Sequence, residues 1–180
     1  MLVYANIVKF VKKSINMSLV IRKGKKKDMP AVLGLIKELA TFEREPAAVV
    51  VTVDDLVRDG FSLNPLFQTF IAEYGDEIVG MALFYNRYST WKGKTIHLED
   101  LIVKENKRQL GIGKALYDEV LKYALNEKVR RVEWVVLDWN TPAIDFYKKS
   151  GASILKGWET VQITEENLIN YINRVSNEDI

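Results

Sequence analysis

One segment of the sequence constrains the fold more than any other. Residues 94–103 are rich in β-forming side chains and end in the apolar run 101–103. Apolar residues then recur at a spacing of four, which places them on one face of an α-helix; they are Ile112, Leu116, Val120 and Ala124. Gly111 and Gly113 lie where the connecting loop meets this helix. The segment therefore predicts a strand, a loop and an amphipathic helix, in that order.

The remaining sequence alternates between strand-like and helix-like patterns. Two β-rich runs, 67–74 and 77–85, flank Gly75-Asp76, a pair that favours a hairpin turn. Three more strands are expected, at 18–22, 130–137 and 157–163, and a helix is expected to end the chain. Strands before and after a central helix indicate an α/β fold, with a mixed sheet and helices on both of its faces.

Several residues mark where the other helices should begin. Asp28 can cap a helix that has Pro30 in its first turn. The apolar stripe of that helix is Val32, Leu35, Ile36 and Leu39. Thr52-x-x-Asp55 resembles a capping box for a short helix that should stop at Gly60. Another helix should open at Pro142 and close at Gly151.

The length of 180 residues favours one domain. Residues 1–16 are apolar and basic and stand apart from the rest, and we expect the folded domain to cover 17–180. The apolar part of 1–16 is too short and too interrupted for a secretory signal. No stretch approaches the length of continuous apolar sequence that a membrane span needs, so no membrane association is expected.

Charge and rare residue types exclude several classes of function. With 26 Lys and Arg against 24 Asp and Glu, the charge does not favour a nucleic-acid partner. The absence of Cys excludes disulfides, a thiolate nucleophile and Cys-ligated metals. The single His excludes sites that need two, and no spacing of His or carboxylates suggests a metal. The absence of Cys also fits a reducing compartment, and we expect a cytoplasmic protein.

The two glycines at the start of the central helix are compatible with an anion-binding site. Without a Cβ at Gly111 and Gly113, backbone N–H groups can turn toward a ligand, and the helix N-terminus adds positive partial charge. Arg108 or Lys114 could add a formal charge. The segment lacks the P-loop pattern and the third glycine of a dinucleotide fingerprint. A pyrophosphate site and a plain tight turn both remain open from these residues alone.

The wider context of this loop resembles a known family. Arg108-x-x-Gly111-x-Gly113 between an apolar strand and an amphipathic helix is similar to the acyl-CoA motif of the GNAT acetyltransferase superfamily. Other segments resemble its spermidine/spermine acetyltransferases, and most closely the branch associated with thialysine. These segments are 88–94, 97–100, 137–140 and 146–152. The resemblance extends over about residues 20–164.

The resemblance implies a fold and a cosubstrate site. The fold would be a mixed, mostly antiparallel sheet, splayed near the thioester of acetyl-CoA, with helices on both faces. Backbone groups of Leu101, Ile102 and Val103 would hold the pantetheine arm, and Asn140 would face it. The pyrophosphate would lie at the loop and the helix start, formed by Arg108, Gln109, Leu110, Gly111, Ile112, Gly113 and Lys114.

The resemblance also assigns two catalytic side chains. An alkylammonium is mostly protonated at neutral pH, so a base must accept its proton before the nitrogen can attack. Glu99 is the candidate base, and a salt bridge at a strand edge is the alternative. Strand alternation would place Asp100 on the opposite face from Glu99. Tyr147 is the matching acid for the departing thiolate, and a buried core tyrosine is the alternative.

The acceptor site should combine anionic and aromatic groups. Glu43 and Glu45 lie where the family places acceptor contacts, and Trp91 could stack on a cation or an alkyl chain. Asp100 could fix a cationic acceptor or a neighbouring loop, and Glu99 itself would contact the acceptor. Arg44 interrupts the acidic segment, either as a solvated loop charge or as the partner of an acceptor carboxylate. His97, two residues before Glu99, is either structural or a proton relay for it.

Together, these expectations predict that the protein is an enzyme. The chain should transfer acetyl from acetyl-CoA directly to a primary amine of a small polyamine, diamine or lysine-like acceptor such as thialysine, without a covalent enzyme intermediate. An acetyltransferase of protein or peptide amines and a non-catalytic acyl-CoA-binding module are the alternatives. The resemblance also implies a homodimer, to which residues 165–172 could contribute.

Overall fold

The computed structural model describes residues 18–178, and the expected extension at 1–16 lies outside the described residues. The chain divides into two compact units, Met1–Val135 and Val136–Ile180. The first unit contains the sheet and the helices α1, α2 and α3, and the second contains α4 and α5. Within residues 18–178, no helix is long and apolar enough to cross a membrane.

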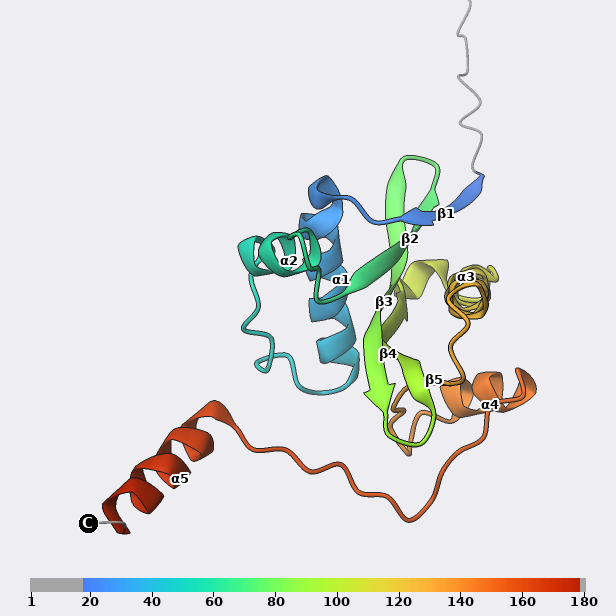
Figure 1. Ribbon diagram of the computed structural model, residues 1–180. Coiled ribbons are helices and arrows are strands. Elements are labelled where there is room, and N and C mark those ends of the chain that lie inside the picture. Colours follow the sequence, from blue (N-terminus) through green and yellow to red (C-terminus); the bar gives the residue numbers. More distant parts are fainter. Residues whose placement is uncertain (1–17, 179–180) are drawn as a thin grey trace, which may run out of the picture. The chain divides into compact units, whose positions relative to one another are not determined.

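The first unit is built on a five-stranded sheet in the order β1-β2-β3-β4-β5 (Figure 1). Strands β1 to β4 pair antiparallel, and β5 pairs parallel with β4. The mixed, mostly antiparallel sheet is confirmed, as is the hairpin turn between the second and third strands. The strands are β1 (Leu19–Lys23), β2 (Gln68–Tyr74), β3 (Glu77–Ser89), β4 (Gly93–Val103) and β5 (Val132–Glu133).

The sheet is open between its last two strands. Only two residue pairs join β4 to β5, and they are Ile96 with Val132 and His97 with Glu133. The strand expected at 130–137 is therefore much shorter than its sequence suggested. From Leu98 onward, the outer edge of β4 has no strand partner among the described residues. Its backbone groups on that edge are left available to a ligand.

Helices cover both faces of the sheet (Figure 1). On one face lies α1 (Met29–Phe42), whose buried Val32 and Leu35 pack in a core with Leu56 of α2 (Val53–Gly60) and apolar side chains of β2, β3 and β4. On the other lies α3 (Ile112–Asn126), whose Tyr123 ring is 5.1 Å from the Phe84 ring. The stripe predicted for α3 is confirmed, since all four of its residues are buried.

The predicted helix caps have mixed outcomes. The capping box at Thr52 is confirmed, because the Asp55 N–H donates to Thr52 Oγ1 and the Thr52 N–H donates to the Asp55 carboxylate. Asp28 precedes α1, but its side chain does not cap it. Instead the buried carboxylate of Asp28 accepts hydrogen bonds from the Arg22 guanidinium and the Lys25 N–H. The bond from Arg22 lowers the pKa of Asp28. A buried carboxylate needs a cation to compensate its charge, so the Asp28 side chain pairs with Arg22 instead of capping α1.

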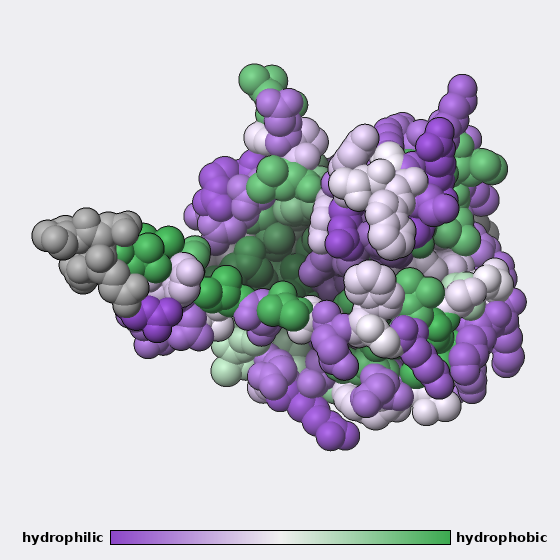
Figure 2. Space-filling model, turned by 60° about the horizontal axis from the view of Figure 1, so that its bottom comes forward, coloured by the Kyte–Doolittle hydropathy of each residue, from purple (hydrophilic) through white to green (hydrophobic). Residues whose placement is uncertain are grey.

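The second unit contains α4 (Thr141–Lys149) and α5 (Glu165–Glu178). The strand expected at 157–163 is wrong, because these residues form no strand. Residues 153–176 are exposed, so many apolar side chains of this segment face solvent. The face drawn in Figure 2 likewise shows apolar residues among polar ones at the surface. The large exposed apolar residues of the segment are Ile154, Leu155, Trp158, Val161, Ile163, Leu168, Ile169, Tyr171, Ile172 and Val175.

Candidate active site

A β-bulge in β4 shapes one side of the candidate site. Asp100 lies opposite Leu83 of β3, and Leu98 lies opposite Phe84, so Glu99 is an extra residue without a partner on β3. Residues directly opposite each other share a face of the sheet. Leu98 therefore shares the α3 face with Phe84, and Asp100 lies on the α1 face with Leu83. The strict alternation predicted around Glu99 is wrong, because a bulge redirects the side chains beside it.

Three carboxylates gather at this bulge on the α1 face. The pKa of Asp100 is raised to about 6, mainly by burial and in addition by the negative charges of Glu99 and Glu43. Burial also raises the pKa of Glu43, which directly follows the last residue of α1. We call Glu43, Glu99 and Asp100 the carboxylate cluster. Neighbouring negative charges stabilise a cation placed between them, so the cluster suits an ammonium group.

Two ring side chains flank Glu99. His97 Nε2 lies 3.6 Å from Glu99 Oε2, and the His97 ring is 5.3 Å from that of Tyr85. Burial raises the pKa of Tyr85, and the charge of Glu99 and a hydrogen bond with it add to this effect. Tyr85 therefore stays protonated at neutral pH and can donate to Glu99. The sequence did not reveal Tyr85, because its position opposite His97 follows from the pairing of two strands.

The predicted anion cradle, residues 108–114, comprises the loop between β4 and α3 and the first residues of that helix. Gly111 is the N-cap of α3 with φ 77°, and no side chain caps the helix. The N–H groups of the first helical turn have no acceptor within a helix and remain available to a ligand. Gln109 also has a positive φ, of 66°. The backbone is therefore strained at Gln109, just before the uncapped start of α3.

Gly113 is not required by the packing of the protein itself. Its φ is not in the left-handed region, and a Cβ added to it would lie 3.7 Å from Val103 Cγ2, an ordinary contact. An alanine would also favour the helix. The glycine leaves the backbone at the helix start accessible, as the predicted pyrophosphate contact would require.

The charged side chains of the cradle are already engaged. Arg108 Nε donates to the Val103 carbonyl at 3.2 Å, and its guanidinium lies 5.3 Å from the centre of the Phe42 ring. Lys114 pairs with Asp118 one turn later in α3. The anion-binding capacity of the cradle therefore lies mainly in its backbone. The predicted neighbours Leu101, Ile102 and Val103 form the end of β4, along its open edge.

Asn140 and Tyr147 lie on α4 in the second unit. Asn140 is the N-cap of this helix, and its Oδ1 accepts a hydrogen bond from the Ala143 N–H at 3.3 Å. Tyr147 is the buried residue of α4, with its ring 5.3 Å from that of Phe146. Their proposed roles toward the cosubstrate stay predictions.

Two of the expected acceptor residues lie apart from the carboxylate cluster. Trp91 is 78% exposed at the turn between β3 and β4. Five residue pairs of the ladder separate the bulge from the last pair before this turn, which corresponds to about 17 Å along the strands. Glu45 lies in the exposed turn after α1, where its N–H donates to the Ala40 carbonyl.

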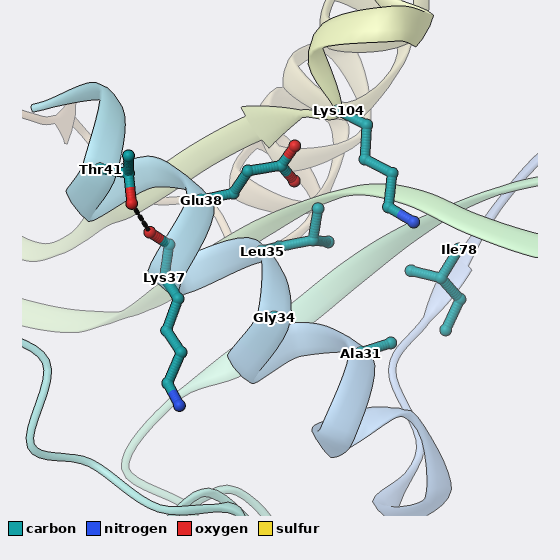
Figure 3. Close-up of a pocket in the computed structure, with 8 residues that line it drawn as sticks. All are labelled: Ala31, Gly34, Leu35, Lys37, Glu38, Thr41, Ile78 and Lys104. Atoms are coloured by element: carbon teal, nitrogen blue, oxygen red, sulfur yellow. Dashed lines mark hydrogen bonds between the residues drawn. The ribbon is translucent and has the colours of Figure 1, made fainter. Parts of the chain in front are cut away.

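A groove of about 400 Å³ lies beside α1 (Figure 3). Glu38 projects from α1 toward the side where Lys104 lies, whereas Lys37 points away from it (Figure 3). Lys104 is held by Glu77 through a hydrogen bond of 2.8 Å. No residue of the carboxylate cluster or the cradle lines this groove, so it does not define the site. Within residues 18–178, no group of three His, Cys, Asp or Glu side chains, the carboxylate cluster included, is arranged so that it could hold a metal ion.

The first unit thus combines an uncapped helix start, an open strand edge and, on the same strand, the carboxylates Glu99 and Asp100. The sequence profile of the acetyltransferase (GNAT) family matches residues 35–152. The chain therefore belongs to the GNAT family and is an acyltransferase.

Known proteins agree with this assignment. The chain is 37% identical over 160 residues to a thialysine N-epsilon-acetyltransferase of Sus scrofa, covering 83% of this chain and 94% of that protein. It is 38% identical over 125 residues to an L-ornithine N5-acetyltransferase of Arabidopsis thaliana, covering 69% and 52%. A solved integron cassette protein of V. cholerae has the same fold, with a TM-score of 0.72 at 24% identity and coverage of 87% and 98%.

Proposed function

We propose that the protein transfers acetyl from acetyl-CoA to a primary amine of a small polyamine, diamine or lysine-like acceptor. The observation that carries this proposal is the carboxylate cluster at the bulge of β4. A cationic amine would be attracted to it, and a base for the amine proton lies within it. The names of the relatives, which refer to amino acids with a second amine, support the same chemistry.

The proposed reaction is a direct transfer. Glu99 accepts a proton from the ammonium, and the neutral nitrogen attacks the thioester carbonyl carbon. A carbon–nitrogen bond forms, the carbon–sulfur bond breaks, and the leaving thiolate takes a proton from the Tyr147 hydroxyl. The nitrogen gives up its second proton to water as the amide forms, and proton exchange with water restores the Tyr147 hydroxyl and the Glu99 carboxylate. Tyr85 hydrogen-bonds to Glu99 and would orient its carboxylate. Backbone groups of 101–103 would hold the pantetheine arm, and the amides of the cradle would hold the pyrophosphate.

Two substitutions test the catalytic roles. Tyr147→Phe and Glu99→Gln should each lower kcat by roughly 10²- to 10⁴-fold, because each removes a proton-transfer group. Release of free thiol from acetyl-CoA gives the rate. Tyr171→Phe, on the exposed face of α5, removes a hydroxyl elsewhere and should leave the rate unchanged. Unchanged turnover in Tyr147→Phe would remove the acid role from this residue.

A panel of amines tests the reaction class. Spermidine, putrescine, thialysine, lysine and a lysine peptide are compared in the same thiol-release assay. Activity with at least one small amine supports the proposal. Activity with the peptide alone would identify a protein acetyltransferase, and thiol release with none would leave an acyl-CoA-binding module.

We further propose a homodimer in the cytoplasm. The many exposed apolar side chains of residues 153–176 support the dimer, since such side chains gather where a second surface covers them. The absence of Cys supports a reducing compartment.

A further inference from the structure

Arg87 lies on the same face of the sheet as the carboxylate cluster. Tyr85 is opposite His97, and Arg87 is opposite Thr95, two residues further toward the turn. Residues two apart on a strand share a face, so Tyr85 and Arg87 project from the same side of β3. The hydroxyl of Tyr85 interacts with Glu99 and also with the charges of Arg87 and Glu133. Tyr85 therefore lies between the carboxylate cluster and Arg87.

Arg87 belongs to a cluster with an excess of positive charge. Its Nη1 lies 2.8 Å from Glu133 Oε1 on β5, and Arg131 Nε lies 2.9 Å from Glu133 Oε2. Two guanidinium groups thus share one carboxylate. The Arg87 side chain is 55% exposed, whereas that of Glu133 is 24% exposed. A guanidinium has five N–H donors, so Arg87 retains donors for a second carboxylate while it holds Glu133.

The two charged regions form the ends of one strip. Thr95, which lies opposite Arg87, precedes Glu99 by four positions in β4. This separation is roughly 13 Å along a strand, and the long side chains at both ends shorten the gap between their charges. The strip is negative at Glu99 and positive at Arg87. A ligand that matches it carries an amine at one end and a carboxylate at the other.

We propose that Arg87 binds the carboxylate of an amino-acid acceptor whose side-chain amine is acetylated at Glu99. This inference rests on the proposed function and narrows its acceptor to a lysine-like amino acid. The guanidinium can engage a carboxylate through two parallel hydrogen bonds. A polyamine carries only positive charge and is disfavoured at the Arg87 end. Arg87 thus takes the role that the sequence suggested for Arg44.

The test compares two acceptors that differ in one group. Cadaverine is lysine without its carboxylate, so the ratio of kcat/KM for lysine to that for cadaverine isolates the carboxylate contact. Wild type should prefer lysine. Arg87→Gln should lower kcat/KM for lysine by about tenfold or more, the value of a charge-assisted hydrogen bond, and leave cadaverine unchanged or improved. Lys122→Gln removes one positive charge from exposed α3, on the opposite face, and should keep the wild-type ratio.

The outcomes separate this inference from the proposed function. Absence of thiol release by wild type with every small amine, including spermidine and putrescine, contradicts the proposed function, whereas release with spermidine or putrescine alone contradicts only the amino-acid acceptor. Wild-type preference for cadaverine, or equal losses for both amines in a folded Arg87→Gln variant, contradicts the role of Arg87 alone. Retained activity with cadaverine shows that the variant is folded. If Arg87→Gln does not fold, Arg87→Lys keeps the charge without the planar pair of donors, and its lysine-to-cadaverine ratio should fall below that of wild type.

Discussion

Glu99 is the additional residue of the bulge in β4, and this bulge determines which side chains surround it. The sequence predicted acidic residues for an acceptor site, and three of them, Glu43, Glu99 and Asp100, interact with one another in the structure. The sequence pattern placed Glu99 and Asp100 on opposite faces, whereas the bulge brings both into one cluster with Glu43. A bulge depends on how two strands pair, and such pairing is not encoded in either strand alone.

Tyr85 and Arg87 likewise owe their importance to strand pairing, which the sequence of a single strand does not reveal. Both lie in a strand that the sequence predicted correctly or in its extension beyond residue 85. Their importance comes from neighbours on β4 and β5 that are distant in the sequence, such as His97 and Glu133. Hydrophobic periodicity assigns strands, but it does not reveal which polar residues meet across them.

Asp100 should make the stability of the protein depend on pH. Its pKa rises from 3.8 to about 6 in the folded state, so between these values the folded chain holds a proton that the unfolded chain has lost. This contribution to stability is complete below about pH 4 and is lost as the pH rises through about 6. One pKa unit corresponds to about 1.4 kcal/mol, so the loss is up to about 3 kcal/mol.

Asp100→Asn tests this expectation by urea unfolding at about pH 4 and pH 7. The neutral amide has no charge to desolvate, so the free energy of unfolding should exceed that of wild type at pH 7 and match it near pH 4. Activity with a cationic acceptor should fall, because one carboxylate of the cluster is lost. A constant difference between the two proteins at both pH values would contradict the assigned pKa.

At the scale of elements, the sequence was most informative where a pattern repeats. The stripes of α1 and α3 and the capping box of α2 depend on residues within one turn or a few turns of each other, and all three are present in the structure. The strand expected at 157–163 is absent, because a strand requires pairing with a neighbour as well as β-forming residues, and these residues pair with none.

The start of α3 permits a contrast between its two glycines. Gly113→Ala should leave the free energy of unfolding unchanged or raise it by up to about 1 kcal/mol, because alanine favours a helix. The new methyl group should obstruct the cradle and raise KM for acetyl-CoA at least about tenfold, since one lost charge-assisted hydrogen bond has that effect. Wild-type KM in this variant would contradict an anion site at the helix start.

Gly111→Ala is the matched substitution. Gly111 has a φ of 77°, which an alanine adopts at a cost of about 1–2 kcal/mol. Its free energy of unfolding should therefore decrease, in contrast to that of Gly113→Ala. Urea unfolding of the two variants tests whether Gly111 is needed for its backbone conformation. Steady-state kinetics test whether Gly113 is needed for binding of acetyl-CoA.

At the scale of the whole molecule, the C-terminal segment is the feature that the isolated chain explains least. Leu168 and Ile172 are about half exposed and lie one turn apart on α5, so they share a face of the helix. If this face contacts a second copy, the double substitution of both residues by Glu should yield a monomer in sedimentation experiments where wild type is a dimer. Asn170→Glu adds a charge on another face of α5 and should leave the dimer intact. A monomeric wild type at micromolar concentration would contradict the proposed assembly.

The gap between β4 and β5 has a consequence for the empty enzyme. A strand edge with free backbone groups can accept a strand from any other chain, and for this reason natural sheets usually shield their edges. Here the edge from Leu98 to Val103 cannot be shielded permanently without closing the place proposed for the cosubstrate. Without the cosubstrate, this edge would stay open to pairing with another strand. Acetyl-CoA, by lying along β4, would act as a removable edge protector as well as an acyl donor.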